Sequence, residues 1–248
     1  MSRVICSAEF TELWEAPFES VDDINRRGQG WSEVGRIDFQ PAIAASAPIA
    51  AYLKRQHHYR ARTVRHPIRG IPTLRREYQM LGEVSAAGVG VAEPLYFAEQ
   101  SDGRALLVVE ALQGYVSLDQ WSAAQADRQA RSQLILAQRR QVLESVAWLV
   151  RKVHDLGVCH GCLYPKHLFW HAGTGDVRLI DWEKARFSRR SQRSRLRDLD
   201  SLNRHAPGWS RRERVWFLAA YLGVRVGDPS LRLLWKKLLV KYRSKVSG

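Results

Sequence analysis

Cysteine and long apolar runs are scarce in this sequence of 248 residues, and each shortage excludes a class of protein. Three cysteines are too few, and odd in number, for the disulfide framework of a small secreted protein, so they suit a reducing compartment. The longest uncharged run, near "FQPAIAASAPIAAYL", contains two prolines and falls short of the roughly 20 apolar residues that cross a bilayer. The start of the chain shows no signal-peptide core. We therefore expect a cytoplasmic protein.

Acidic residues are also few, and the charge balance favours anionic partners. The 25 acidic residues face 39 lysines and arginines, which gives a formal net charge of +14. Such a surface attracts nucleic acid, anionic lipid or phosphorylated glycan. No recognised nucleic-acid module surrounds the basic run at residues 54–69, so we expect no specific nucleic-acid partner. A hydrophobic fraction of 45% with nine tryptophans indicates a globular protein.

The first half of the chain reads as strands and loops with one strong helix. Residues 25–39 combine a glycine turn with alternating residues, and residues 49–56 form a β-like run, so both predict strands of one sheet. Residues 105–112 predict a buried strand. A helix is predicted from Pro72 to a stop at Gly88, with these apolar residues at helical spacing: Leu74, Tyr78, Leu81 and Val84. Glu77 shares the face of Leu74 and Leu81.

The second half is predominantly helical in pattern. A helix is predicted over about 129–156, because Val142, Val146, Leu149 and Val153 recur at helical spacing. Residues 176–181 predict a short strand, and everything after residue 195 reads as helix. This order predicts an α+β fold of two lobes, with an N-lobe at 1–112 and a mostly helical C-lobe at 113–248.

The stretch "VHDLGVCHGCLYPKHLF", residues 153–169, contains three histidines and two cysteines. Zinc ligation by Cys159, Cys162, His167 and His171 has plausible spacing, but the apolar residues between them must pack into a core. We therefore expect no structural zinc. A redox pair at Cys159 and Cys162 would need a helix N-terminus, whereas a helix has just ended. Burial as small core residues remains the alternative for Cys159.

The same stretch, taken with its flanks, matches the order of parts in a protein-kinase-like site. His160 opens a catalytic-type loop, Cys162 stands where an Asp is usual, and His167 stands where an Asn is usual. Single pieces such as a glycine turn are usually structural, but several in the correct order are stronger. The other pieces are a phosphate flap at Gly28 and Gly30, a strand lysine at Lys54, its helix partner Glu77, adenine contacts at Glu110 and Leu112, and a metal-binding Asp181.

With these residues in place, the sequence resembles the lipopolysaccharide core kinase family, and its InaA-like branch in particular. The passages that carry the resemblance are "GQGWSEV", "LRREYQMLGEVSAAGV", "HGCLYPKHLF", "LIDWEKAR" and "RDLDSLNR". The resemblance implies a two-lobed protein-kinase-like fold and transfer of the ATP γ-phosphate to a heptose or Kdo sugar of the lipopolysaccharide inner core. It also implies ATP with Mg²⁺ or Mn²⁺ as cofactors, a core lipopolysaccharide or other anionic glycolipid as acceptor, and a place at the inner face of the inner membrane.

The resemblance assigns roles that the residue types support only in part. Lys54 would hold the nucleotide phosphates, and Asp181 with His167 would hold the metal. Cys162 replaces the usual base, whose removal commonly costs about 10²–10⁴-fold in rate, which leaves His160 or His167 as bases. Imidazole at His167 suits softer ions than Mg²⁺. A weak or inactive pseudokinase, which binds nucleotide or a partner in envelope stress or lipopolysaccharide assembly, is therefore the alternative.

Two basic segments bear on the acceptor. Ten arginines lie between Arg186 and Arg214, where the acceptor cleft is expected, and arginine binds phosphate in a bidentate manner. Residues 231–245 have apolar residues on one side and basic residues on the other. This segment either lies on anionic lipid or packs its apolar side on the lobe.

Overall fold

The computed structural model describes residues 4–6, 10–21, 23–40, 47–62, 66–68, 70–126, 133–188 and 191–246. The chain divides into two compact units. The N-terminal unit contains Met1–Ala87 and Ala92–Gln113, and the C-terminal unit contains Gly88–Val91 and Gly114–Gly248. The main division thus lies one residue beyond the predicted boundary at residue 112, and the second unit gains a short segment that precedes it in the sequence.

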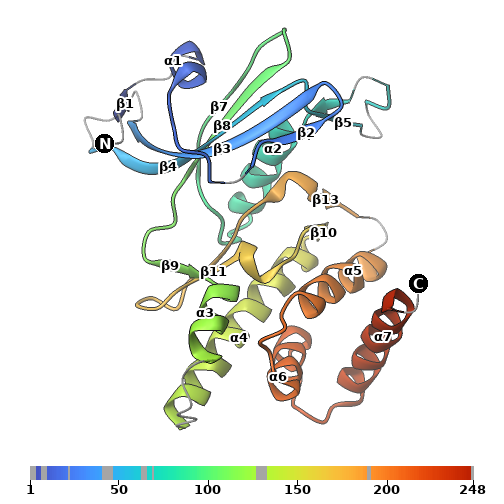
Figure 1. The fold of residues 1–248 in the computed structure, drawn as a ribbon. Coiled ribbons are helices and arrows are strands. Elements are labelled where there is room, and N and C mark those ends of the chain that lie inside the picture. The colour runs from blue at the N-terminus through green and yellow to red at the C-terminus, as the bar shows by residue number, and fades with distance from the viewer. Residues whose placement is uncertain are drawn as a thin grey trace. The chain divides into compact units, whose positions relative to one another are not determined.

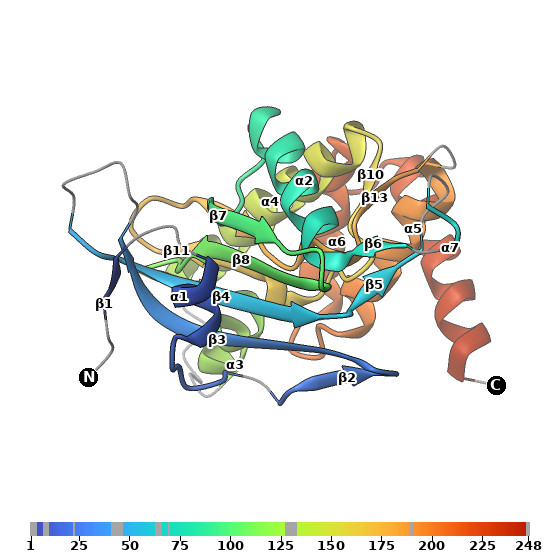
Figure 2. The same ribbon diagram turned by 90° about the horizontal axis from the view of Figure 1, so that it is seen from above.

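A six-stranded sheet dominates the N-terminal unit (Figures 1 and 2), in the order β1-β3-β4-β8-β7 with β2 paired to β3. Its strands are β1 (Val4–Cys6), β2 (Asn25–Arg27), β3 (Gly30–Gln40), β4 (Ile49–His57), β7 (Pro94–Glu99) and β8 (Arg104–Glu110). All neighbours are antiparallel except β1 and β3. The strands predicted at 25–39, 49–56 and 105–112 are confirmed.

The predicted helix of this unit is confirmed as α2 (Thr73–Ala86), which packs against β7 and β8 (Figure 2). Leu74, Leu81 and Val84 are buried as expected. Tyr78, the fourth apolar residue of the pattern, is 40% exposed and stacks on Phe97, because a phenol at the edge of the apolar face can keep its hydroxyl in water. A second short helix, α1 (Phe10–Glu15), had no prediction. The unit also has a small ladder of β5 (Arg60–Ala61) and β6 (Ile71–Pro72).

The C-terminal unit is mostly helical, as predicted. Its helices are α3 (Leu118–Ala126), α4 (Gln133–Asp155), α5 (Ser191–Arg204), α6 (Arg211–Leu222) and α7 (Pro229–Val246). A three-stranded sheet joins β9 (Tyr115–Ser117), β11 (Leu168–His171) and β12 (Val177–Leu179), and β10 (Val158–Cys159) pairs with β13 (Arg186–Phe187). Two single-turn 3₁₀ helices are η1 (Pro165–His167) and η2 (Trp182–Lys184).

The core of this unit forms around α4. All four residues that predicted this helix, Val142, Val146, Leu149 and Val153, are buried. The helix begins at Gln133, whereas the predicted start at 129 lies outside the described residues. The predicted strand at 176–181 is shorter, as β12. None of the described helices is both long enough and apolar enough to cross a membrane.

Candidate active site

Strand β4 and helix α2 bring Lys54 and Glu77 into contact in the N-terminal unit. The Lys54 Nζ atom lies 2.5 Å from Glu77 Oε1. The Glu77 side chain is only 3% exposed, and that of Lys54 is 17% exposed. A buried carboxylate is costly without a partner, so Glu77 holds the ammonium group in one position. The two residues that the sequence paired at a separation of 23 positions therefore meet in the fold.

The two predicted flap glycines lie in the hairpin between β2 and β3. Gly28 occupies the exposed turn with a φ of +62°, a conformation that favours glycine. Gly30 is buried, and a Cβ atom there would lie 2.6 Å from the carbonyl oxygen of His58. Close backbone packing is therefore sufficient to require glycine at position 30. Gly28 carries no such constraint beyond its φ angle.

The predicted adenine contacts follow strand β8. The Glu110 N–H donates to Glu93 O at 2.9 Å, and the Glu110 carboxylate accepts from the Glu93 N–H at 3.1 Å. Glu110 therefore fixes the course of the chain at the end of the strand. Leu112 follows two residues later with a half-buried side chain.

In the C-terminal unit, His167 and Asp181 face each other. The Nδ1–H of His167 donates to the carbonyl oxygen of Cys162 at 2.8 Å, because a carbonyl can only accept. Its Nε2 atom lies 3.4 Å from Asp181 Oδ2. Asp181 has φ 65° and ψ 62°, a left-handed conformation that is uncommon outside glycine and recurs at functional sites. η1 presents the imidazole, and the end of β12 presents the carboxylate.

This pair fits a divalent cation. With the Nδ1–H bonded to a carbonyl, a neutral His167 directs its Nε2 lone pair toward a carboxylate oxygen, which is repulsive unless a cation or a proton lies between them. No group of three or more metal-ligating side chains occurs among the described residues. The pair would therefore supply two ligands, and phosphate oxygens and water would complete the coordination, as is usual for magnesium–nucleotide sites.

His160 is enclosed and neutral. Its side chain is fully buried, its Nε2–H donates to Ile180 O at 3.1 Å, and its ring packs edge-on against Trp182. Burial lowers the pKa of His160 to about 4. Its Nδ1 atom has no hydrogen-bond partner. An imidazole in this position braces the loop and is poorly placed to accept a proton from a substrate.

The two cysteines of the loop are buried thiols. Burial, followed by the charge of Asp181, raises the pKa of Cys162, and nearby Lys184 opposes this rise. Burial raises the pKa of Cys159 to about 11. Both groups are therefore protonated at neutral pH. The four residues considered as zinc ligands do not meet in one metal-binding group of the described chain.

Sequence reasoning missed Asp198, a fully buried residue of α5 that anchors the loop. Its carboxylate accepts the N–H groups of His160 at 2.7 Å and Gly161 at 3.0 Å, and it lies 3.3 Å from the Nε2 atom of His154. Burial by itself raises the pKa of Asp198, but these donors hold it below its usual value. Residue order gave no signal for this role, because the two N–H donors lie 37 and 38 positions away in the sequence.

The described arginines among the ten after β12 divide into two groups. Arg195 donates to His154 O, Arg204 donates to Asp200 at 3.3 Å, and Arg214 donates to backbone carbonyls, so these three fix the local fold. Five others are exposed on this unit: Arg186, Arg193, Arg197, Arg211 and Arg212. Arg189 and Arg190 lie outside the described residues. The exposed set is the part of the cluster available to an anionic acceptor.

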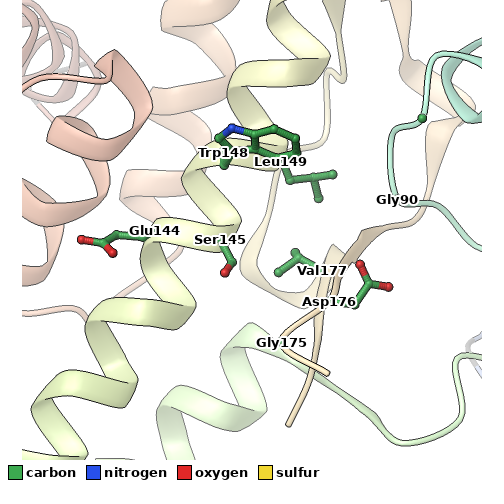
Figure 3. Close-up of a pocket in the computed structure, with 9 residues that line it drawn as sticks. Gly90, Glu144, Ser145, Trp148, Leu149, Gly175, Asp176 and Val177 are labelled. Carbon is green, nitrogen blue, oxygen red and sulfur yellow. The ribbon is translucent and has the colours of Figure 1, made fainter. Parts of the chain in front are cut away.

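A cavity of about 440 Å³ in the C-terminal unit contains none of these site residues. In Figure 3, Ser145 and Leu149 lie on the side of α4 that is nearer Val177, and the carboxylate of Glu144 points away from Asp176. The Asp176 carboxylate is bound by the Tyr115 hydroxyl and by Arg178. Because the Asp176 carboxylate is already bound by other side chains and that of Glu144 points away, we assign no reaction to this cavity.

Comparison with known proteins places this chain in a family. Residues 11–221 match the family described as "Lipopolysaccharide kinase (Kdo/WaaP) family". "Protein InaA" of Escherichia coli (strain K12) is 28% identical over 202 residues, which cover 79% of this chain and 88% of that protein. The solved structure "WaaP in complex with acyl carrier protein" superimposes with a TM-score of 0.66 at 21% identity, over 98% of this chain and 97% of the other. This similarity confirms the protein-kinase-like α+β fold. The chain belongs to the lipopolysaccharide kinase (Kdo/WaaP) family.

Proposed function

We propose that this chain is an ATP-dependent kinase that phosphorylates a heptose or Kdo sugar of the lipopolysaccharide inner core, at the cytoplasmic face of the inner membrane. The observation that carries the proposal is the 2.5 Å contact between Lys54 and buried Glu77, because a kinase needs one ammonium group held for the nucleotide phosphates. Membership in a family of lipopolysaccharide kinases supports the acceptor class.

The proposed mechanism is mainly positioning and charge neutralisation. Lys54 binds the α- and β-phosphates, with Gly28 in the flap and Leu112 beside the adenine. Asp181 and His167 would hold Mg²⁺ or Mn²⁺, and the bound ion would supply charge neutralisation for phosphoryl transfer. Phosphoryl transfer passes through a loose transition state, so a strong base at the acceptor is less important than alignment.

The exposed arginines of the C-terminal unit support an anionic acceptor. Arg193 and Arg197 are exposed on α5, and Arg186 is exposed on β13. The planar guanidinium group binds phosphate and carboxylate oxygens in pairs, and a phosphorylated core glycan carries both groups. We therefore propose that these side chains orient the sugar that receives the phosphate.

The alternative is a pseudokinase that binds nucleotide or a partner without efficient turnover. It is favoured by the protonated thiol of Cys162 at the usual base position and by the enclosed, neutral imidazole of His160. His167 cannot serve as a base while its Nε2 lone pair binds a metal ion. Under this alternative the Lys54 and Asp181 sites still bind nucleotide, but the acceptor is not phosphorylated.

Incubation with ATP and core lipopolysaccharide tests the proposal directly. The purified chain is supplied with Mg²⁺ or Mn²⁺, with and without acyl carrier protein because the similar WaaP structure contains it, and the glycan is weighed. We expect the mass of one added phosphate, lost in Lys54→Met and Asp181→Ala but kept in Asp176→Asn. Nucleotide binding without any added phosphate favours the pseudokinase, and no nucleotide binding contradicts the kinase function.

A further inference from the structure

The last helix of the chain exposes aliphatic side chains that its own unit does not cover. α7 packs beside α5 and α6 (Figure 1), and its Leu231 and Leu238 are buried. On the other side of the helix, Leu233 is 55% exposed and Val240 is 69% exposed. Seven residues separate these two, so they lie on the same face of an α-helix. They form an apolar stripe that points away from the packed face.

Basic side chains border this stripe on both sides. Lys236 and Lys237 are exposed, and each lies three or four residues from Leu233 and from Val240, the spacing of neighbours on a helix surface. Arg232 is exposed on the same helix. The sequence of α7 contains neither Asp nor Glu, so no carboxylate of the helix offsets these charges. The face thus combines exposed aliphatic groups with positive charge.

We propose that this face, the lipid-facing stripe formed by Leu233, Lys236, Lys237 and Val240, binds the surface of an anionic lipid bilayer. A helix of this kind lies in the plane of the interface, with aliphatic groups inserted and lysine ammonium groups extended to the headgroups. The binding surface stands on the exposure of these side chains alone. Only its purpose, to bring the enzyme to an acceptor anchored in lipid, rests on the proposed function.

The composition of the stripe favours lipid over an acidic protein partner. Protein interfaces are depleted in lysine and depend on aromatic or arginine anchors near their centre. The stripe has aliphatic side chains at its centre and lysines at its borders, and Trp235, the aromatic residue among the described side chains of α7, is half-buried on the packed side. Lysine borders with aliphatic centres are typical of helices at lipid interfaces.

Vesicle binding tests the proposal without nucleotide or acceptor. The full chain is sedimented with vesicles of phosphatidylcholine alone, or of phosphatidylcholine with anionic phosphatidylglycerol. One basic residue near an anionic surface contributes about fivefold to binding, so Arg232, Lys236 and Lys237 together should give about a hundredfold preference for anionic vesicles. Raising the salt concentration to about 1 M should remove most of this preference, because the Debye length falls to about 3 Å.

Two double variants separate the contribution of charge to vesicle binding from the contribution of the apolar side chains. Lys236→Gln/Lys237→Gln should bind anionic vesicles about twentyfold more weakly and lose most of the salt dependence. Leu233→Ser/Val240→Ser should bind about tenfold more weakly at every salt concentration, because two aliphatic groups no longer insert. Circular dichroism checks that both variants keep the native helix content, which exposed positions should allow.

Matched control variants remove two exposed aliphatic side chains, or two exposed charged side chains, from the N-terminal unit. Ile24→Ser/Ile68→Ser deletes two exposed aliphatic groups, and Arg26→Gln/Arg62→Gln deletes two exposed charges. Both controls should bind anionic vesicles within about twofold of the unmodified chain.

Three results would overturn the lipid-facing stripe. The first is no vesicle binding, which is the result expected if the stripe binds an acidic protein partner instead. The second is equal binding to both vesicle types. The third is an equal loss of binding in the α7 variants and in the controls. Failure of the proposed kinase function would be seen separately, as absence of phosphate transfer to detergent-dispersed lipopolysaccharide by a chain that still binds vesicles.

Discussion

His167 and Asp181 are the residues on which the proposed chemistry depends most. Loss of an outer partner of a metal ligand commonly weakens metal binding by about 10–100-fold. Asp181→Asn changes a proposed ligand itself, so it should weaken metal binding at least about tenfold. Electron paramagnetic resonance of Mn²⁺ with a non-hydrolysable ATP analogue measures this affinity. Asp176→Asn is the matched control, because that carboxylate is bound by Tyr115 and Arg178. Equal Mn²⁺ affinities in the two variants would remove Asp181 from the metal site.

Cys162 limits the expected rate. A protonated, buried thiol gives no general base, so Cys162→Ser should change the rate constant of phosphate transfer by less than about threefold. Cys162→Asp should raise it, up to the about 10²–10⁴-fold that such a base contributes. Lys184 lies close enough to lower the pKa of Cys162. Its positive charge would partly offset the charge of a second carboxylate beside Asp181. A Cys162→Asp variant that is folded and slower than the unmodified chain would show that the loop does not act as proposed.

His160 predicts how stability depends on pH. Its folded pKa of about 4 lies below the ordinary value of 6.5, so it contributes stability that is fully present above pH 6.5 and is lost as the pH falls toward 4. The free energy of unfolding should fall by about 1.4 kcal/mol per pH unit in this window. The contribution of Asp198 is lost only below its ordinary value of 3.8.

Urea unfolding at several pH values measures the His160 contribution. The slope between pH 6.5 and 4 should become shallower in His160→Gln, which keeps a donor for Ile180 O but does not titrate. His205→Gln, at an exposed histidine, should leave the slope unchanged. Identical slopes in His160→Gln and the unmodified chain would mean that another group carries the acid sensitivity.

At the scale of elements, α5 holds the loop between β10 and β11 through Asp198. Asp198→Asn should lower the free energy of unfolding by about 3 kcal/mol, because hydrogen bonds to a charged group contribute about 1.5–3 kcal/mol each and are only partly replaced by an amide. Thermal unfolding measures the loss, and the exposed Asp155→Asn provides the control. A loss of less than about 0.5 kcal/mol would contradict the anchoring role.

Most elements could be predicted from the sequence because their periodicity reports burial. The helix around Leu74 and Leu81 and the helix around Val142 and Val146 follow directly from apolar spacing. Helix α1 could not be predicted, because six residues give too short a pattern, and Leu13 is buried by the sheet rather than by its own helix. Strand ends moved by one or two residues, which alternation alone does not define.

Residue order was sufficient to predict the contact between Lys54 and Glu77, but not the contacts that packing decides. Lys54 and Glu77 could be paired because a strand and the next helix carry them in kinase order. The left-handed backbone of Asp181 and the hydrogen bond that orients His167 depend on local geometry. Residue types alone do not predict that geometry. Asp198 gathers donors from 37 and 38 positions away, a separation that sequence patterns do not report.

At the scale of the whole molecule, the net charge of +14 agrees with the anionic acceptor class of its family. Part of the positive charge is used inside the fold, as with Arg195 and Arg214. Exposed basic residues remain on α5, α6 and α7 of the C-terminal unit, where we place the acceptor and the lipid surface, and others are exposed on the N-terminal unit.

The mass of the core glycan in living cells tests the central claim most directly. Core lipopolysaccharide is isolated from the source bacterium, from a strain with the gene deleted, and from that strain carrying either the unmodified gene or the Asp181→Ala variant. The kinase function predicts that deletion removes one phosphate, that the unmodified gene restores it and that Asp181→Ala does not. A glycan of unchanged mass in all four strains, together with no transfer in vitro under any metal, would contradict it and favour the pseudokinase.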